Sequence, residues 1–251
     1  MWKFKLLSLF VIIICIQQSS RNVFATEIRV AVANNFANTI KQIARNFEKQ
    51  TAHKVWLIFG STGKHYAQIK NGAPFDIYFA ADIKRPKLLD EEGIVQKDSR
   101  FTYALGKLVL WSPSGINIDS AGKVLEQQNI RHLAMANPKL APYGKAAQEV
   151  LETLGLWDVI RNKIVLGENI GQTFQFVKSG NAELGFVAYS QLIQHGQVID
   201  GTFWNIPTNL YSPIEQQVVL LNSNQTALDF ISYFKSNESQ KTIRQFGYST
   251  P

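Results

Sequence analysis

The residues EIRVAVANNFANTIKQIARNFEKQ, at positions 27–50, decide the fold. The run Glu27–Ala33 is rich in β-branched and small apolar residues, which predicts a strand. From Phe36 to Gln50, apolar residues recur every three or four positions, which predicts an amphipathic helix. A strand followed directly by such a helix begins a βαβ unit. The helix would bury one stripe of side chains against a sheet: Phe36, Ile40, Ile43, Ala44 and Phe47.

The same alternation continues along the chain and predicts an α/β protein with mainly parallel sheets. No repeat, low-complexity tract or long linker interrupts the pattern, so any division into lobes must run through strands that cross between them. Further strands are predicted at 55–58, 76–80, 108–111, 133–136, 163–166, 184–188 and 216–221, and helices at 65–71, 145–154, 173–178, 226–235 and 239–246.

The composition is that of a globular protein with a substantial core. The chain has 251 residues, of which 45% are hydrophobic and 18% charged, with 16 Gly and 8 Pro. These values exclude a disordered, collagen-like or coiled-coil protein and leave one large domain or two smaller ones. The net charge of +7 lies partly in an N-terminal segment with the features of a targeting signal.

Residues 1–25 have the pattern of a secretory signal peptide. Lys3 and Lys5 precede an apolar run over 6–16, and small residues near Ala25 indicate cleavage after it. A membrane anchor would need about 20 apolar residues, and a lipid anchor on Cys15 would need a small residue just before it. Cleavage would remove the only cysteine and three basic residues, which lowers the net charge from +7 to +4. We therefore expect a periplasmic protein without disulfides or nucleic-acid partner.

Four junctions between a strand and a helix carry the chemistry. Polar or glycine-containing backbone occurs at 33–35, 59–63, 141–144 and 168–171. Each junction alone could be only a helix cap or a turn. Ligands of open α/β sheets bind at the carboxyl ends of strands, however, and helix N-termini there offer unpaired N–H groups. Four such junctions in one chain predict an anion site.

At these positions the chain resembles the periplasmic molybdate-binding proteins of bacterial ABC importers. The resemblance covers almost the whole chain after residue 25, and several separate blocks in the same order make it specific. It implies a type II two-lobe fold with hinge strands, in which 26–105 and 208–251 form the first lobe and 106–207 the second. The blocks are VAVANNF (30–36), FGSTG (59–63), GAPFDI (72–77), AAD (80–82), 137–144, GENI (167–170) and 180–187.

The resemblance also implies the residues that hold a molybdate or tungstate dianion between the two lobes. In the first lobe they are Asn34 or Asn35 and the pair Ser61 and Thr62. In the second lobe they are the main-chain N–H groups of two residues at helix starts. The residues that would contact the metal oxide through its oxygens are Asn35, Thr62, Tyr143 and Ile170, and the whole predicted set is Asn34, Asn35, Ser61, Thr62, Tyr143 and Ile170.

The sequence departs from the family at one position. Some members add a tyrosine hydroxyl where this chain has Ala188, which has no donor. Tyr189 is adjacent, but strand alternation would point it to the other face. The side-chain amide of Asn35 could supply the missing donor.

Neutral donors suit a buried dianion. Each charge-assisted hydrogen bond is worth about 1.5–3 kcal/mol, so six or seven could offset the loss of hydration. The protein would then discriminate against sulfate by the size of its cavity. The sequence does not decide between molybdate and tungstate as the ligand, because the two ions are almost equal in size. We expect binding to be nearly independent of pH between about 6 and 8, no cofactor, a monomer, and a permease of the inner membrane as partner.

The residues leave open two alternatives to a molybdate-binding protein. Ser61 and Lys64 have the Ser-x-x-Lys spacing of an envelope serine hydrolase, although the accompanying motifs of those enzymes are missing. A binding protein for sulfate, phosphate or another small anion is the other. Asp76 and Asp82 are expected to be structural rather than catalytic, and the four histidines show no metal-site spacing. We therefore expect a binding protein, not an enzyme.

Overall fold

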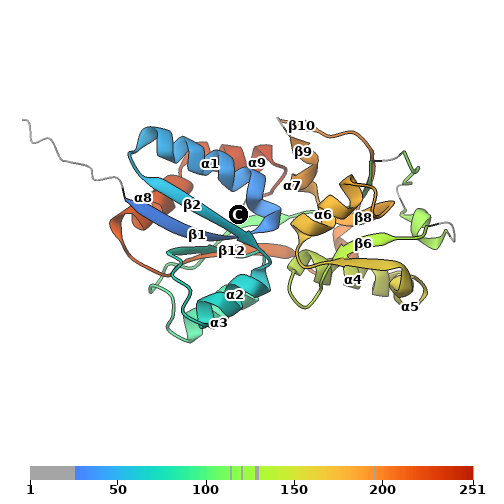
Figure 1. The fold of residues 1–251 in the computed structure, drawn as a ribbon, viewed down its shortest axis with the longest axis horizontal. Coiled ribbons are helices and arrows are strands. Elements are labelled where there is room, and N and C mark those ends of the chain that lie inside the picture. The colour runs from blue at the N-terminus through green and yellow to red at the C-terminus, as the bar shows by residue number, and fades with distance from the viewer. Residues whose placement is uncertain (1–25, 114, 120, 128–129, 195, 251) are drawn as a thin grey trace, which may run out of the picture.

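The computed structural model describes residues 26–250 except 114, 120, 128–129 and 195, so the expected signal peptide at 1–25 lies outside the described residues. Two five-stranded sheets lie side by side along the long axis of the molecule, each with helices on both faces (Figure 1). Among the residues that the structure describes, no helix is both long and apolar enough to cross a membrane.

The first sheet is mixed. Strand β1 pairs in parallel with β2 and β3, whereas β12, which returns from the other lobe, is antiparallel to β3 and β4. Its strands in spatial order are β2 (Lys54–Gly60), β1 (Glu27–Ala33), β3 (Ile77–Phe79), β12 (Ile214–Leu220) and β4 (Phe101–Gly106).

Helices α1, α8 and α9 cover one face of this sheet, and α2 and α3 cover the other (Figure 1). The five apolar side chains predicted to form the stripe over 36–50 are all buried, which confirms the prediction. The first of them belongs to a short 3₁₀ helix, η1 (Asn34–Phe36), that precedes α1. The helix bounds are α1 (Ala37–Gln50), α2 (Thr62–Lys70), α3 (Lys84–Glu91), α8 (Gln225–Phe234) and α9 (Asn237–Gln245).

The second sheet repeats the mixed pattern. Strand β6 pairs in parallel with β7 and β8, whereas β5 is antiparallel to β8 and β11. Its strands in spatial order are β11 (Thr202–Asn205), β5 (Leu108–Ser112), β8 (Leu184–Ala188), β6 (Leu133–Ala136) and β7 (Ile164–Gly167).

Helices α4 and α5 pack on one face of the second sheet, and α6 and α7 pack on the other. The strands β9 (Ile193–Gln194) and β10 (Gln197–Val198) form a separate antiparallel pair. The remaining bounds are α4 (Pro142–Thr153), α5 (Trp157–Ile160), α6 (Ile170–Lys178), α7 (Tyr189–Leu192), η2 (Lys123–Glu126), η3 (Arg161–Lys163) and η4 (Thr208–Leu210).

The chain crosses between the sheets twice, from β4 to β5 at Lys107 and from β11 to β12 over 206–213. The two-lobe α/β fold expected from the sequence is therefore confirmed. The sheets are mixed rather than mainly parallel, because the strands next to the crossings run antiparallel to their neighbours. The division at 26–105, 106–207 and 208–251 remains a prediction.

Candidate functional site

The register of the first sheet brings two predicted binding segments together. Strands β1 and β2 are parallel, and their last residues, Ala33 and Gly60, are paired. The residues that follow each strand therefore leave the same edge of the sheet. Asn34 and Asn35 begin η1 after β1, and Ser61 is the N-cap of α2 after β2.

The second lobe presents its predicted donors in the same way. Strands β6 and β7 are parallel and end in register at Ala136 and Gly167. Tyr143 lies in the first turn of α4, directly after a proline that is well suited to that position. Ile170 is the first residue of α6, whose N-cap Asn169 accepts a hydrogen bond from the main-chain N–H of Gln172 at 3.0 Å.

All six predicted residues line one small cavity between the lobes. Its volume is about 10 Å³, the space that the centre of one water-sized sphere would explore. Among the described residues, none that lines this cavity carries a charged side chain. Five of the six are buried, and Asn34 is half-buried. The residues around the cavity are Ala33, Asn34, Asn35, Gly60, Ser61, Thr62, Ala81, Ala141, Pro142, Tyr143, Asn169 and Ile170.

The two hydroxyls of the first lobe are held by the main chain. Ser61 Oγ accepts from the N–H of Lys64 at 3.3 Å, and Thr62 Oγ1 accepts from the N–H of Ala81 at 3.0 Å. Tyr78 donates its hydroxyl to the Thr62 carbonyl at 2.7 Å. Each hydroxyl is thus fixed by a bond that it accepts, which leaves its own proton available to donate.

Residues at three helix starts also line the cavity. Thr62, Tyr143 and Ile170 each lie in the first turn of a helix of at least nine residues. N–H groups in the first turn have no partner within the helix, and the helix dipole adds partial positive charge there. Three helix N-termini converging on one cavity form an environment suited to an anion.

The side-chain amide of Asn35 makes hydrogen bonds that the sequence did not predict. Its Nδ2 donates to Gln216 Oε1 at 2.7 Å and to the hydroxyl of Tyr248 at 3.0 Å, while its Oδ1 is buried without a partner among the described residues. Both amide protons are therefore committed inside the first lobe. A role for this amide in place of the hydroxyl missing at Ala188 stays a prediction. The contacts with Gln216 and Tyr248 were not expected, because these residues lie far away in the sequence.

Direct contacts hold the two lobes together around the cavity. The N–H of Gly63 donates to the Leu140 carbonyl at 2.8 Å, and Arg85 Nη2 donates to the Lys139 carbonyl at 2.9 Å. Lys64 Nζ lies 2.9 Å from a carboxylate oxygen of Glu168. These contacts join residues of the first lobe to residues of the second, so the structure is closed.

His65 joins the two first-lobe segments beneath the cavity. Its Nε2 lies 3.2 Å from the Val32 carbonyl, and its Nδ1 lies 3.1 Å from Gln68 Oε1. A Cβ at Gly60 would come within 2.8 Å of the ring, so glycine is needed for this close approach. Burial lowers the pKa of His65 from its ordinary value because it disfavours the charged form.

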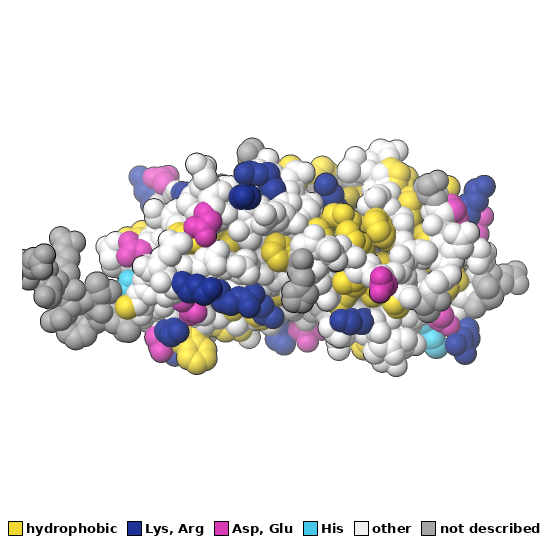
Figure 2. Space-filling view, turned by 90° about the horizontal axis from the view of Figure 1, so that it is seen from above, with side chains coloured by type: hydrophobic (Ala, Val, Ile, Leu, Met, Phe, Trp, Pro, Cys, Tyr) yellow, Lys and Arg dark blue, Asp and Glu magenta, His cyan; other side chains and the backbone are white. Residues whose placement is uncertain are grey.

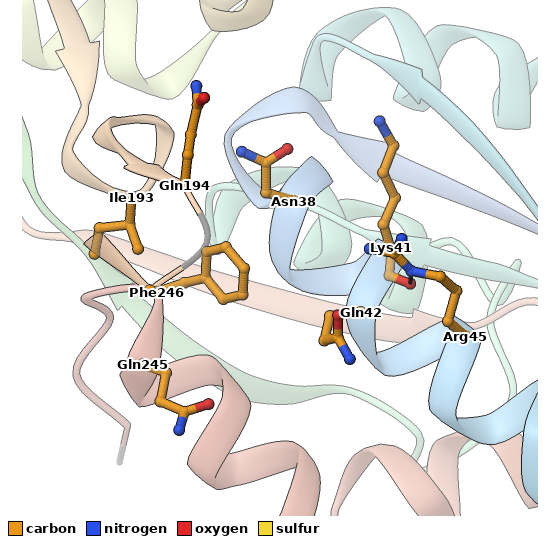
Figure 3. A pocket seen from close by; sticks show the side chains of 9 residues that line it. Asn38, Lys41, Gln42, Arg45, Ile193, Gln194, Gln245 and Phe246 are labelled. Carbon is orange, nitrogen blue, oxygen red and sulfur yellow. Dashed lines mark hydrogen bonds between the residues drawn. The ribbon is translucent and has the colours of Figure 1, made fainter. Parts of the chain in front are cut away.

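A larger hollow of about 650 Å³ lies beside the lobes, between α1, β9 and the end of α9. Phe246 occupies its middle, and Lys41 extends away from that ring (Figure 3). The Lys41 ammonium lies 5.0 Å from the centre of the Phe59 ring, and Arg45 Nε donates to the Lys41 carbonyl at 3.1 Å. Lys41 and Arg45 in this hollow thus have contacts of their own.

On the face seen from above, basic side chains lie in separate groups with acidic ones between them (Figure 2).

A family model described as bacterial extracellular solute-binding protein matches residues 28–249. The chain belongs to this family. The molybdate-binding protein of Azotobacter vinelandii is 48% identical over 227 residues, which is 89% of this chain and 90% of the relative. The molybdate-binding protein of Rhodobacter capsulatus is 43% identical, covering 90% of this chain and 89% of the relative.

Solved structures of solute-binding proteins agree with the fold. The structure of the periplasmic molybdate-binding protein of Azotobacter vinelandii has a TM-score of 0.86 at 44% identity, covering 89% of this chain and 99% of that chain. The sulfate-binding protein SubI of Mycobacterium tuberculosis has a TM-score of 0.67 at 14% identity, covering 90% of this chain and 87% of that chain, and shows the fold alone.

As a solute-binding protein, the chain is a transport component and not an enzyme. The Lys64 ammonium is paired with Glu168, and Ser61 Oγ accepts from the main-chain N–H of Lys64 as the N-cap of α2. The carboxylate of Asp76 accepts from the main-chain N–H of Arg29 at 2.7 Å and from the Asn224 amide at 2.7 Å, as expected for a structural residue. Among the described residues, no cluster of His, Cys, Asp and Glu could hold a metal ion.

Proposed function

We propose that this protein binds molybdate or tungstate in the periplasm and delivers the oxyanion to the permease of an ABC importer in the inner membrane. The observation that carries the proposal is the small cavity between the lobes, where residues with hydroxyls and residues at three helix starts meet and none of the described residues has a charged side chain. Relatives that are 48% and 43% identical are molybdate-binding proteins, which supports the same ligand here.

Both lobes contribute donors to the proposed cage. Ser61 and Thr62 would each donate a hydroxyl, and Thr62 would also donate its main-chain N–H. Tyr143 and Ile170 would donate main-chain N–H groups from the opposite lobe. Asn34 and Asn35 complete the proposed set at the start of η1. Because the donors come from both sides, the anion would stabilise the closed arrangement over an open one.

The energy balance favours many fixed donors. A dianion loses a large hydration energy on burial. Hydrogen bonds to a charged group contribute about 1.5–3 kcal/mol each, so six or seven together can offset that loss. Side-chain and main-chain donors already held by caps and helices need little reorganisation when the anion enters.

Size would determine which oxyanion binds best. The cavity admits one water-sized sphere, and a tetrahedral oxyanion is larger, so the lobes must separate slightly to admit it. The two crossings at Lys107 and at 206–213 would act as the hinge. A cage set by the larger molybdate or tungstate would leave sulfate short of some donors.

A thermal-shift panel tests this function. The protein without residues 1–25 is heated with molybdate, tungstate, sulfate, phosphate or ferric citrate, because a ligand that prefers the folded state raises the melting temperature. We expect the largest increase with molybdate and tungstate. A larger increase with sulfate or phosphate would instead assign a different anion, and no increase with any oxyanion would reject the function. Size-exclusion chromatography would test the expected monomer.

A further inference from the structure

The main-chain carbonyl of Asn35 lies between two buried hydroxyls. Ser190 Oγ donates to this oxygen at 2.9 Å. The hydroxyl of Tyr248 lies 2.8 Å from the same oxygen and 2.9 Å from Ser190 Oγ, so it can donate to either. Ser190 and Tyr248 are each 4% exposed, so water cannot readily replace these bonds.

These three residues do not belong to one lobe. Asn35 follows β1, and Tyr248 follows α9, both on the first sheet, whereas Ser190 lies in α7 on the second sheet. Tyr248 can therefore keep its bond to Asn35 in any arrangement of the lobes. The bond from Ser190 exists only when the lobes are closed, and it ends on a residue that lines the proposed cage.

The residue next to Ser190 holds the opposite wall of the cage. Gln191 Nε2 donates to the Ile170 carbonyl at 3.0 Å, and its Oε1 accepts from the N–H of Ala188 at 2.9 Å. The short helix α7 thus contacts the cage wall of each lobe through two consecutive side chains. A movement of α7 relative to the first lobe must break the Ser190 bond while the Gln191 bond is kept.

We propose that Ser190 is a positioning residue for oxyanion binding, which closes the lobes on the anion without touching it. The proposal rests on the proposed function. Ser190 stabilises the closed state by a bond between the lobes, from its hydroxyl to the main-chain carbonyl of Asn35. Its role is to slow release of the anion, because opening must break this bond first. Selection among anions is left to the donors of the cage.

The experiment compares Ser190→Ala with Ser179→Ala. Ser179 is the exposed C-cap of α6. Its hydroxyl bonds to the Gln175 and Phe176 carbonyls and accepts from the Asn181 side-chain amide, all within the second lobe, so the control removes the same group away from both the cage and the lobe contact. Association and dissociation rates for molybdate are measured by stopped-flow tryptophan fluorescence. The loss of one neutral hydrogen bond predicts a dissociation rate of Ser190→Ala about 3- to 10-fold above that of wild type, with the association rate within about twofold.

Two results of the binding measurements would overturn the proposal. One is a dissociation rate of Ser190→Ala equal to that of Ser179→Ala. The other is a changed ratio of molybdate to sulfate affinity, which would make Ser190 a direct ligand. A double-mutant cycle with Tyr248→Phe adds a check, since the two hydroxyls are in contact and their effects should not be additive. Additive effects would contradict a shared bond, and circular dichroism verifies that each variant is folded.

A distance measurement separates this proposal from the proposed function, because it needs no ligand. Cysteines placed by Lys87→Cys in α3 and Glu152→Cys in α4 carry spin labels, one on each lobe. Without ligand, we expect a longer mean distance between the labels in the Ser190→Ala background than in the wild-type background. Equal distances would reject the role of Ser190 even if molybdate binds. Failure of every oxyanion to bind would reject the function but not the contact between the lobes.

Discussion

The main-chain N–H of Gly63 donates to the carbonyl of Leu140 across the interface between the lobes, at 2.8 Å. Gly63 lies in the first turn of α2, directly after the proposed donors Ser61 and Thr62. A Cβ at this position would come within 3.0 Å of the Leu140 carbonyl oxygen and within 3.1 Å of its Cα. The absence of a side chain therefore allows the two backbones to meet next to the proposed cage.

The first prediction concerns Gly63→Ala. The added methyl group should hold the lobes apart and weaken molybdate binding about 10-fold, measured by isothermal titration calorimetry. Alanine favours a helix over glycine by about 1 kcal/mol, so the melting temperature without ligand should stay the same or rise. A fall in that melting temperature together with the loss of binding would indicate general destabilisation instead.

The second prediction concerns Thr62→Ala. The change removes a proposed donor to the anion, and we expect binding to weaken by about 1–3 kcal/mol in calorimetry. It also leaves the buried N–H of Ala81 without its acceptor, so the unliganded protein should melt at a lower temperature. The matched control is Thr153→Ala, at the end of α4 and exposed. Unchanged affinity in Thr62→Ala would remove this hydroxyl from the site.

The third prediction concerns Tyr143→Phe. If the main-chain N–H is the donor, the variant should bind molybdate within about threefold of wild type, because phenylalanine keeps that N–H. The phenol hydroxyl accepts a long bond from Gln216 Nε2, at 3.4 Å. A loss of more than about 1.4 kcal/mol, a tenfold change, would mean that the phenol itself contacts the anion.

The fourth prediction concerns pH. Burial lowers the pKa of His65 below its ordinary value of 6.5, with Lys64 and Glu168 as the charged groups that act on it. Below pH 6.5 the unfolded chain takes up a proton that folded His65 does not, so the free energy of unfolding should decrease as the pH falls. The slope from this residue is at most about 1.4 kcal/mol per pH unit, and it ends once the lowered pKa is passed.

Denaturant unfolding at several pH values measures this effect. The decrease below pH 6.5 should be smaller in His65→Gln than in wild type. Equal slopes in His65→Gln and wild type would show that His65 takes up its proton as readily in the folded state as in the unfolded state. Molybdate binding itself should stay nearly constant between about pH 6 and 8, since none of the described residues that line the cavity is charged.

The local patterns of the sequence were enough to predict an α/β protein with an anion site where strand ends meet helix starts, because helix N-termini have the same unpaired groups in any fold. The two lobes and the individual donors, such as Thr62 and Ile170, came from the resemblance to periplasmic molybdate-binding proteins. Helix α1 begins one residue later than predicted, and the other predicted helices begin one to three residues earlier, as α4 does at Pro142. The strands β4 and β11 and the helix α3 were not predicted, since their apolar patterns are short.

The hydrogen bonds of Asn35 to distant residues could not be predicted. Asn35 and Gln216 are 181 residues apart, and Asn35 and Ser190 are 155 residues apart. No spacing rule connects positions so distant, and a serine or glutamine in a strand or helix carries no local sign of its partner. The prediction that the Asn35 amide could donate to the anion considered only the local sequence. In the structure, Gln216 and Tyr248 accept both hydrogen bonds of that amide.

The two crossings of the chain also determine the order in which the sheets can be completed as the chain grows from its N-terminus. Strand β12 lies between β3 and β4, and β4 has no other neighbour within the first sheet. That sheet stays incomplete until the segment from Ile214 has been synthesised. The second sheet consists of residues 108–205 only, so all of its strands are present before β12 is.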